Sequence, residues 1–275
     1  MTDFFQPLFN PYLNLLSICY NNFMTADKPR ILFFGTPAFG AKVLESLYSF
    51  GFNVSGIVTQ PTKKGGRGNL LSSSKVKETA DKYGLLLYQP STKNEITSIT
   101  DHIKPDLIIT AAYGQILPPD TLNIPKYGAL NVHGSLLPRY RGASPAAATI
   151  LNGDKETGIT IMKMSDNLDA GPIVSQVKIK INPKETTESL YEKLTEAGAE
   201  ELIRAIPLYI NGDLRPHEQD HNKATYCSVI KKKDGQIDWN RSAVDIERTI
   251  RAFIPWPHAF TNWNSKLLKI LEADV

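Results

Sequence analysis

The segment at residues 30–37 reads RILFFGTP, an apolar run that ends in a glycine, a threonine and a proline. A run of this length and composition is typical of a strand that is buried on both faces of a sheet. The proline suits the first turn of a helix, and apolar residues recur at helical spacing over 43–47. The segment therefore predicts the first strand and helix of an α/β domain.

The chain beyond this segment continues to alternate strands with helices. Strands are predicted at 53–59 (NVSGIVT), 85–88 and 106–112 (DLIITAA), and a helix at 75–83. Strands that alternate with helices form βαβ units with right-handed crossovers. The predicted fold class is therefore α/β, with a doubly wound and mostly parallel sheet.

After the run that ends at Val132, two more strands are predicted, at 157–164 and 172–181. A threonine pair at 186–187 then opens a long helix with one apolar face, and Gly212 marks the end of this helix. The main domain therefore closes with a strand pair and a long helix.

Composition changes divide the chain into four segments. We predict an N-terminal extension at 1–27, the main domain at 28–212, a polar linker at 213–230, and a second unit at 231–275. The extension carries neither the basic residues of a secretory signal nor the arginines of a transit peptide. The second unit, with about 45 residues, is too short to be a stable domain without support from its neighbour.

The bulk composition of the 275 residues sets limits on the class of protein. The formal net charge is only +3, so charge by itself does not indicate a nucleic-acid partner. Cys19 and Cys227 stand far apart and outside any metal-ligand spacing, which favours a reduced cytoplasmic protein. No apolar run reaches the roughly 20 residues that span a bilayer. We expect a cytoplasmic monomer without metal and without membrane contact.

Two short motifs are too weak to assign a function. Residues 35–40, GTPAFG, carry a proline where the dinucleotide-binding fingerprint needs its middle glycine. Residues 217–221, HEQDH, match the zinc-protease pattern HExxH, which binds zinc only on a helix. This stretch follows a proline in a polar segment, so we interpret it as a chance match in a solvated linker.

The strongest indication of a site is Asn131-Val-His133, at the end of a predicted strand. Ligands bind at the carboxyl ends of strands in open α/β sheets, and period-two alternation puts the Asn and the His on one face. An amide and an imidazole could together hold a carbonyl oxygen and its developing charge. A buried structural histidine beside a turn-capping asparagine explains the same spacing equally well.

A carboxylate that could orient the imidazole is predicted in the loop 166–171, DNLDAG. Asp169 precedes Ala-Gly-Pro, a tight turn that would hold its carboxylate in place. Distance along the chain does not show that Asp169 reaches His133, and aspartate is also an ordinary turn residue.

Residues 60–77, QPTKKGGRGNLLSSSKVK, contain five basic residues and no acidic residue. A glycine-rich, mobile basic loop next to a strand suits a large polyanion such as RNA. A solvated surface loop is the alternative. A second, weaker basic cluster stands at 231–233.

Together these segments resemble the methionyl-tRNA formyltransferase branch of the folate-dependent formyltransferase family, from residue 30 to the end of the chain. HGSLLP with an asparagine two residues before the histidine marks the wider family, whereas the basic loop and the C-terminal segment indicate the tRNA branch. The stretches that carry the resemblance are FFGTPAF, TQPTKKGGRG, AAYGQILP (111–118), GALNVHGSLLPRYRGASP (128–145), NGDKETGITIMKMSDNLDAGPI (152–173) and IDWNRSAVDIERTIRAFIPWPHAF (237–260).

The resemblance implies a role for particular residues. Catalysis falls to Asn131, His133 and Asp169. The implied contacts to folate come from Tyr113, Gly114, Ser135, Leu136, Leu137 and Pro138, and those to tRNA from Lys63, Lys64 and Arg67. The implied fold is a Rossmann-like formyltransferase domain, then a linker, then a C-terminal OB-like barrel that is cut short at Val275.

The activity implied by the resemblance is transfer of a formyl group from 10-formyltetrahydrofolate to the α-amino group of methionyl initiator tRNA. Asn131 and His133 would stabilise the oxyanion, and Asp169 would orient His133 and assist proton removal. Three alternatives stay open: a formyltransferase acting on a small amine, such as glycinamide ribonucleotide or an amino sugar; hydrolysis of the donor by water; and a truncated, non-catalytic RNA-binding relative.

Overall fold

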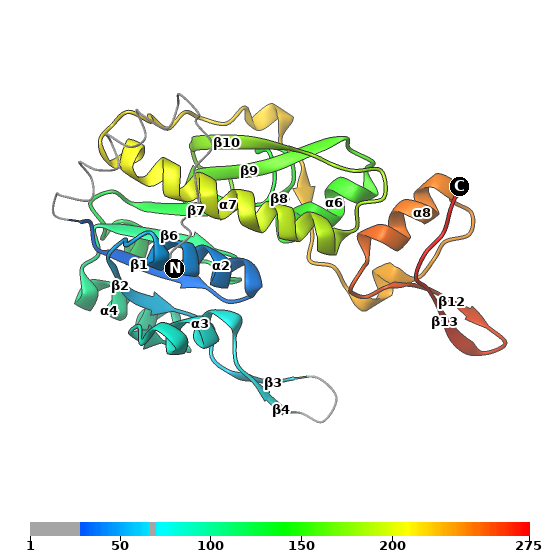
Figure 1. Cartoon of the computed structure of the whole chain (residues 1–275), viewed down its shortest axis with the longest axis horizontal. Coiled ribbons are helices and arrows are strands. Elements are labelled where there is room, and N and C mark those ends of the chain that lie inside the picture. Colours follow the sequence, from blue (N-terminus) through cyan, green and yellow to red (C-terminus); the bar gives the residue numbers. More distant parts are fainter. Residues whose placement is uncertain (1–27, 66–69) are drawn as a thin grey trace, which may run out of the picture.

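The computed structural model describes residues 28–65 and 70–275, and its centre is a seven-stranded sheet (Figure 1). Its strands are β1 Ile31–Gly35, β2 Val54–Val58, β5 Leu87–Tyr88, β6 Leu107–Ala111, β7 Ala129–His133, β9 Glu156–Lys163 and β10 Ile173–Lys180. They follow the order β10-β9-β7-β6-β1-β2-β5. The five strands β7, β6, β1, β2 and β5 run parallel to one another. Strand β9 is antiparallel to both of its neighbours, β7 and β10. The predicted mostly parallel α/β sheet is confirmed.

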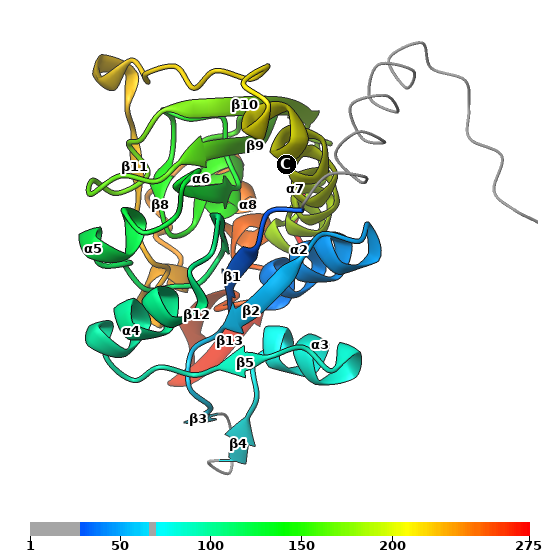
Figure 2. The same ribbon diagram turned by 90° about the vertical axis from the view of Figure 1, so that its left-hand side faces the viewer.

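Helices cover both faces of this sheet, and β1 shows how. Ile31 and Phe33 face a core shared with α2 (Ala38–Ser49) and α7 (Thr187–Ile210). Leu32 and Phe34 face a second core, shared with α4 (Lys93–Ile103) on the opposite side (Figure 2). Because successive side chains of a strand point to opposite faces, a strand buried on both faces is a continuous apolar run.

The remaining helices of the main domain are short: α3 Lys75–Tyr83, α5 Pro119–Leu122 and α6 Pro145–Leu151. Helix α3 has the predicted bounds, with an N-cap bond from Ser74 and a left-handed Gly84 at its end. Pro37 lies at the N-cap of α2 and not in its first turn. Throughout 28–65 and 70–275, no helix has both the length and the apolar character that crossing a bilayer requires.

The predicted basic loop at 60–77 is in part a β-hairpin. Strands β3 (Lys63–Gly65) and β4 (Leu70–Ser72) pair antiparallel and project from the domain beside α3 (Figure 1). Lys63 and Lys64 lie on β3, whereas Arg67 and the predicted extension 1–27 lie outside the described residues. Part of the segment predicted to be a mobile loop thus forms two short strands, whose backbone groups hydrogen-bond to one another.

The segment 213–230, predicted to be a solvated linker, is bound to the main domain. Strand β11 (Tyr226–Cys227) pairs in parallel with β8 (Arg141–Gly142). The backbones of His217 and Ile173 exchange two hydrogen bonds, of 2.8 and 2.9 Å. Most residues of this segment are exposed, but backbone pairing holds it against the main domain. Such pairing leaves no hydrophobic periodicity in a sequence.

The C-terminal unit contains the helix α8 (Ala243–Ala252) and an antiparallel hairpin of β12 (Ala259–Trp263) and β13 (Lys266–Ile270). Its own core is small, with Ile237, Ile250 and Ala259 at the centre. Helix α8 packs against α6, and the Thr187 hydroxyl donates to the Ala252 carbonyl at 2.7 Å. The unit is therefore supported by the main domain, and its strand pair agrees with a partial barrel (Figure 1).

Glu185 lies at the junction between the two units and makes the stability of the protein depend on pH. Its side chain is 5% exposed and accepts hydrogen bonds from Ser189 and Lys193, while its carbonyl accepts one from Arg251 of α8. Burial acts to raise the pKa of the Glu185 carboxyl, but hydrogen bonds from Lys193, Ser189 and the Asn182 N–H outweigh burial and hold that pKa below its ordinary value of 4.5.

We expect Glu185→Gln to lower the free energy of unfolding by about 1–3 kcal/mol at pH 7, because hydrogen bonds to a charged group are lost. A depressed pKa in the folded state stabilises above the unfolded-state value, and the effect vanishes as the pH falls through the folded-state pKa. The difference between the two proteins should therefore be smaller at pH 3 than at pH 7. Urea denaturation at both pH values measures this, with exposed Glu188→Gln as the control; an equal difference at both pH values would contradict it.

Candidate active site at the carboxyl edge of the sheet

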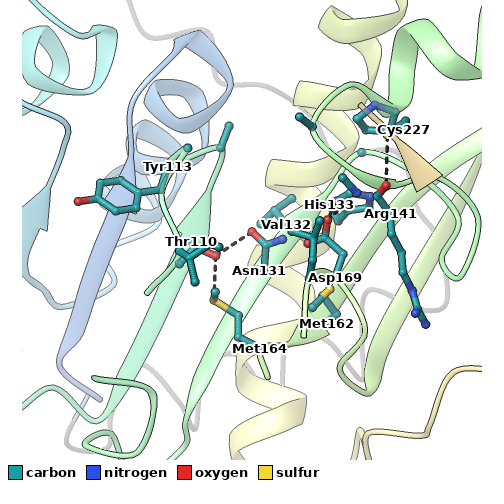
Figure 3. A pocket seen from close by; sticks show the side chains of 18 of the residues that line it. Thr110, Tyr113, Asn131, Val132, His133, Arg141, Met162, Met164, Asp169 and Cys227 are labelled. Carbon is teal, nitrogen blue, oxygen red and sulfur yellow. Dashed lines mark hydrogen bonds and ion pairs between the residues drawn. The ribbon is translucent and has the colours of Figure 1, made fainter. Parts of the chain in front are cut away.

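A cavity of about 870 Å³ opens at the carboxyl ends of β6 and β7, where open α/β sheets bind ligands. Its walls come from segments that are far apart in the sequence, near residues 112–117, 131–134, 141–146, 162–169 and 226–231. Asn131, His133 and Asp169 all line this cavity (Figure 3).

Asn131 is held by a neighbouring strand. The Thr110 hydroxyl on β6 donates to Asn131 Oδ1 at 2.7 Å, across the parallel pair of β6 and β7. The amide nitrogen then turns toward His133 and Asp169 (Figure 3). Asn131 therefore presents a donor, and not an acceptor, to the cavity.

His133 is 6% exposed, and the backbone fixes its ring. Nε2 lies 3.0 Å from the Tyr140 carbonyl oxygen. Because a carbonyl oxygen can only accept, Nε2 carries the proton of this bond. Nδ1 is then the ring atom left for chemistry, and it lies 3.6 Å from Asp169 Oδ2. The carbonyl of Tyr140 orients the ring, a role that the sequence had led us to expect of Asp169.

Asp169 reaches the site from the turn between β9 and β10. Its Oδ2 accepts a hydrogen bond of 2.8 Å from the Gly142 N–H. Its backbone has a φ of 46°, a left-handed conformation that is uncommon for residues other than glycine. Two residues later, a Cβ on Gly171 would lie 2.0 Å from the Lys163 carbonyl oxygen, so this tight turn requires glycine. The structure therefore brings the three predicted catalytic residues together on one cavity.

Ser135, Leu136, Leu137 and Pro138 lie outside the lining of this cavity. Ser135 is fully buried and donates to the Arg139 carbonyl at 2.6 Å. The Leu137 N–H donates to Thr160 Oγ1 at 3.1 Å, and its side chain is 3% exposed. Ser135 and Leu137 of this segment thus support the loop that follows His133.

Tyr113 and Gly114 do line the cavity, in the loop after β6. The Tyr113 ring, however, turns away from Asn131 and His133 into the second core (Figure 3). Burial raises the pKa of the Tyr113 hydroxyl to about 12, so the ring stays neutral. Its carbonyl accepts hydrogen bonds from Thr36 and Gln60, which hold the loop. Tyr113 and Gly114 therefore face the cavity mainly with backbone atoms.

Sequence reasoning missed an apolar rim around the mouth of the cavity. This apolar rim consists of residues that line the cavity although each is more than half exposed: Ile116, Leu168, Tyr226 and Val229. They come from the loops after β6 and β9 and from the segment at β11. No sequence pattern reveals such a set, because only the fold gathers its members.

The residues around HEQDH form no metal site in the part of the chain that the structure describes. Across those residues, no three His, Cys, Asp or Glu side chains are grouped so that they could hold a metal ion. The segment is not an α-helix either: a 3-10 turn, His221–Lys223, begins only at its last residue.

Comparison with known proteins identifies the family of this chain. The model of the formyl transferase family matches residues 29–206, and that of the formyl transferase C-terminal domain matches residues 229–275. A methionyl-tRNA formyltransferase from Dehalococcoides mccartyi is 45% identical over 249 residues, covering 89% of this chain and 78% of that protein. The one from Bacillus subtilis is 44% identical over 244 residues, covering 88% and 77%.

Solved structures show the same fold at much lower identity. A 4-N formyltransferase from Francisella tularensis superposes with a TM-score of 0.71 at 18% identity, over 90% of this chain and 98% of that one. HypX from Aquifex aeolicus in complex with tetrahydrofolic acid gives 0.67 at 18% identity, over 88% and 37%. The sequence relatives and the family models thus indicate the same family. This chain belongs to the formyl transferase family and, within it, to the methionyl-tRNA formyltransferases.

Proposed function

We propose that this chain transfers the formyl group of 10-formyltetrahydrofolate to the α-amino group of methionyl initiator tRNA. The proposal rests on the convergence of Asn131, His133 and Asp169 on one cavity, in a chain 45% identical to a methionyl-tRNA formyltransferase. Formyl transfer needs hydrogen-bond donors for an oxyanion and a group that takes up the amine proton. These three side chains supply both.

In the proposed reaction, a bond forms between the amine nitrogen and the formyl carbon, and the bond from that carbon to N10 of the folate breaks. The former carbonyl oxygen carries the negative charge in the tetrahedral intermediate. The amide nitrogen of Asn131 and, when the ring is protonated, Nδ1–H of His133 would donate to it. The amine loses a proton and N10 gains one; His133 and Asp169 would carry this proton, with no covalent bond to the enzyme.

We propose that the ring system of the donor enters past the apolar rim, where Ile116 and Leu168 offer exposed apolar surface. Flat aromatic groups bind well to such surface, because burial of apolar area is favourable. The backbone of Tyr113 and Gly114 would supply polar contacts inside the cavity. Ser135–Pro138 would act indirectly, through the loop that carries Tyr140 and hence the ring of His133.

For the acceptor, we propose that the hairpin β3–β4 and Lys231, which lines the cavity, contact the phosphates of the tRNA. Phosphate contacts give affinity that falls with salt concentration, because each contact releases counterions. In this arrangement, the β3–β4 hairpin and Lys231 would bind the tRNA. The apolar part of the cavity would bind the folate.

Lys63→Ala and Lys64→Ala should each weaken tRNA binding and reduce the slope of log K against log salt by about 1. Filter binding of initiator tRNA between about 50 and 200 mM salt measures this slope. Lys93→Ala, which removes an exposed lysine at the start of α4, serves as the matched control. A hairpin variant with the wild-type slope would show that its lysine makes no phosphate contact.

The direct test is single-turnover transfer from 10-formyltetrahydrofolate to methionyl initiator tRNA, with free methionine and an amino-sugar nucleotide as competing acceptors. Formylation of the tRNA well above that of the small amines supports the proposal. Transfer to the small amines alone would assign the chain to a different substrate class. Loss of the formyl group without any formylated acceptor would indicate hydrolysis of the donor.

A further inference from the structure

Arg141 is a buried cation beside the active site. It is 3% exposed and lies on β8, directly before the Gly142 whose N–H donates to Asp169. Its guanidinium donates to Gln219 Oε1 through Nε at 3.1 Å and Nη2 at 2.7 Å, and Nη2 also lies 2.9 Å from His221 Nδ1. Among the ion pairs of the described residues, none contains Arg141. Its Nη1 also lies 3.5 Å from the Tyr226 hydroxyl, so side chains other than carboxylates satisfy this charge.

Gln219 connects that cation to the turn of Asp169. Its Nε2 donates to the Asp169 carbonyl at 3.0 Å and to the Gly171 carbonyl at 2.7 Å. Arginine can only donate and a carbonyl oxygen can only accept, so the oxygen and nitrogen of this amide cannot be exchanged. The side chain is 5% exposed, and one buried amide thus spans the gap between β8 and the Asp169 turn.

The same segment also holds the chain where it leaves the Asp169 turn. Two residues before Gln219, the backbone of His217 pairs with Ile173, at the start of β10. The turn needs such support, because Asp169 has a left-handed backbone and its Oδ2 must meet the Gly142 N–H. Without the amide of Gln219, two carbonyls of the turn lose their donor, and the Arg141 guanidinium loses its main acceptor.

We infer that Gln219, itself fixed by Arg141, is a positioning residue that sets the Asp169 carboxylate beside His133. HEQDH is on this account a structural clamp for the Asp169 turn. The inference rests on the proposed function only for the catalytic role of Asp169; the placement of the carboxylate can be measured without any reaction.

Gln219→Leu keeps the approximate size of the side chain and removes both its donor and its acceptor. We expect the single-turnover rate of formyl transfer to fall about 10- to 100-fold, the scale of a displacement of roughly 1 Å in a catalytic group. If Gln219 acts only by positioning Asp169, its substitution should matter little once Asp169 is replaced. In an Asp169→Asn background, Gln219→Leu should therefore lower the single-turnover rate by less than a further threefold. Additive losses in this double-mutant cycle would overturn the inference.

Hydrogen exchange of the Gly142 amide reports the placement of Asp169 independently of turnover. In Gln219→Leu we expect this amide to exchange at least tenfold faster, while the amides of β1 keep their rates. Gln89→Leu is the matched control, since the Gln89 amide also donates to a backbone carbonyl, that of Gln60, far along the chain from Asp169. An unchanged Gly142 amide would overturn the inference even if turnover fell.

If Gln219→Leu fails to fold, Gln219→Glu provides a second test of the same inference. Glutamate still accepts from Arg141 but places a second oxygen against the carbonyls of Asp169 and Gly171, so we expect the same two changes. If the wild-type chain forms no formylated tRNA while the Gly142 amide responds as expected, the proposed function fails and the positioning role stands. If transfer proceeds and neither variant alters rate or exchange, the positioning role fails alone.

Discussion

His133→Ala should slow single-turnover formyl transfer by about 10³-fold while the protein stays folded. The substitution removes the one ring in the cavity that can donate to the oxyanion and also exchange a proton with Asp169, whose Oδ2 lies 3.6 Å from Nδ1. His133 lines the cavity wall, so its loss leaves the sheet intact. Rapid-quench assays with excess enzyme measure the chemical step, and thermal unfolding checks the fold.

The matched control is His102→Ala, which removes an exposed histidine of α4 that lies outside the lining of the cavity. It should leave the rate unchanged. Asn131→Ala should slow transfer by about 10²- to 10³-fold, the usual cost of one oxyanion donor. A His133→Ala protein within tenfold of the wild-type rate would remove the imidazole from the proposed mechanism.

Gly142→Ala should lower the free energy of unfolding by about 3 kcal/mol, from backbone strain and overpacking together. Gly142 has a φ of 117°, and a Cβ there would lie 2.2 Å from the Cys227 carbonyl oxygen. The chain can relieve this contact only by parting β8 from β11. Because the Gly142 N–H also donates to Asp169 Oδ2, formyl transfer should fall as well.

Gly84→Ala separates strain from crowding. Gly84 ends α3 with a φ of 63°, but no atom lies within 4 Å of the position of an added Cβ. The cost there is backbone strain alone, about 1 kcal/mol. Urea denaturation of the two variants compares them directly. Equal losses of stability would show that the close approach of Cys227 to Gly142 adds nothing.

The strands that are buried on both faces were predictable because burial leaves a mark on composition. ILFFG (31–35) places Ile31 and Phe33 in one core and Leu32 and Phe34 in the other, so the run has no polar position. Helix α3 was predictable to the residue because Ser74 and Gly84 are local signals for its ends. Such features depend on residues that are close together in the sequence, so the sequence alone predicts them.

Features that depend on distant partners could not be predicted from the sequence. The segment 213–230, predicted to be a solvated linker, is mostly exposed, yet Gln219 within it is buried and hydrogen-bonded to Arg141, 78 residues earlier in the chain. Tyr113, for which the resemblance implies a folate contact, lines the cavity, while its ring packs into the second core. Ser135–Pro138, part of the family motif HGSLLP, lie outside the lining of the cavity. A conspicuous motif shows that residues matter but does not show which way they face.

The sequence by itself determined the α/β sheet, the position of Asn131 and His133 at the carboxyl end of a strand, and the candidate carboxylate Asp169. Periodicity and turn chemistry encode these features locally. Only the tertiary structure decided that Asp169 meets His133, that the carbonyl of Tyr140 orients the ring, and that Gln219 braces the turn. These contacts join residues brought together by chain folding, and a hydrogen bond between such partners has no periodic signature in either of their segments.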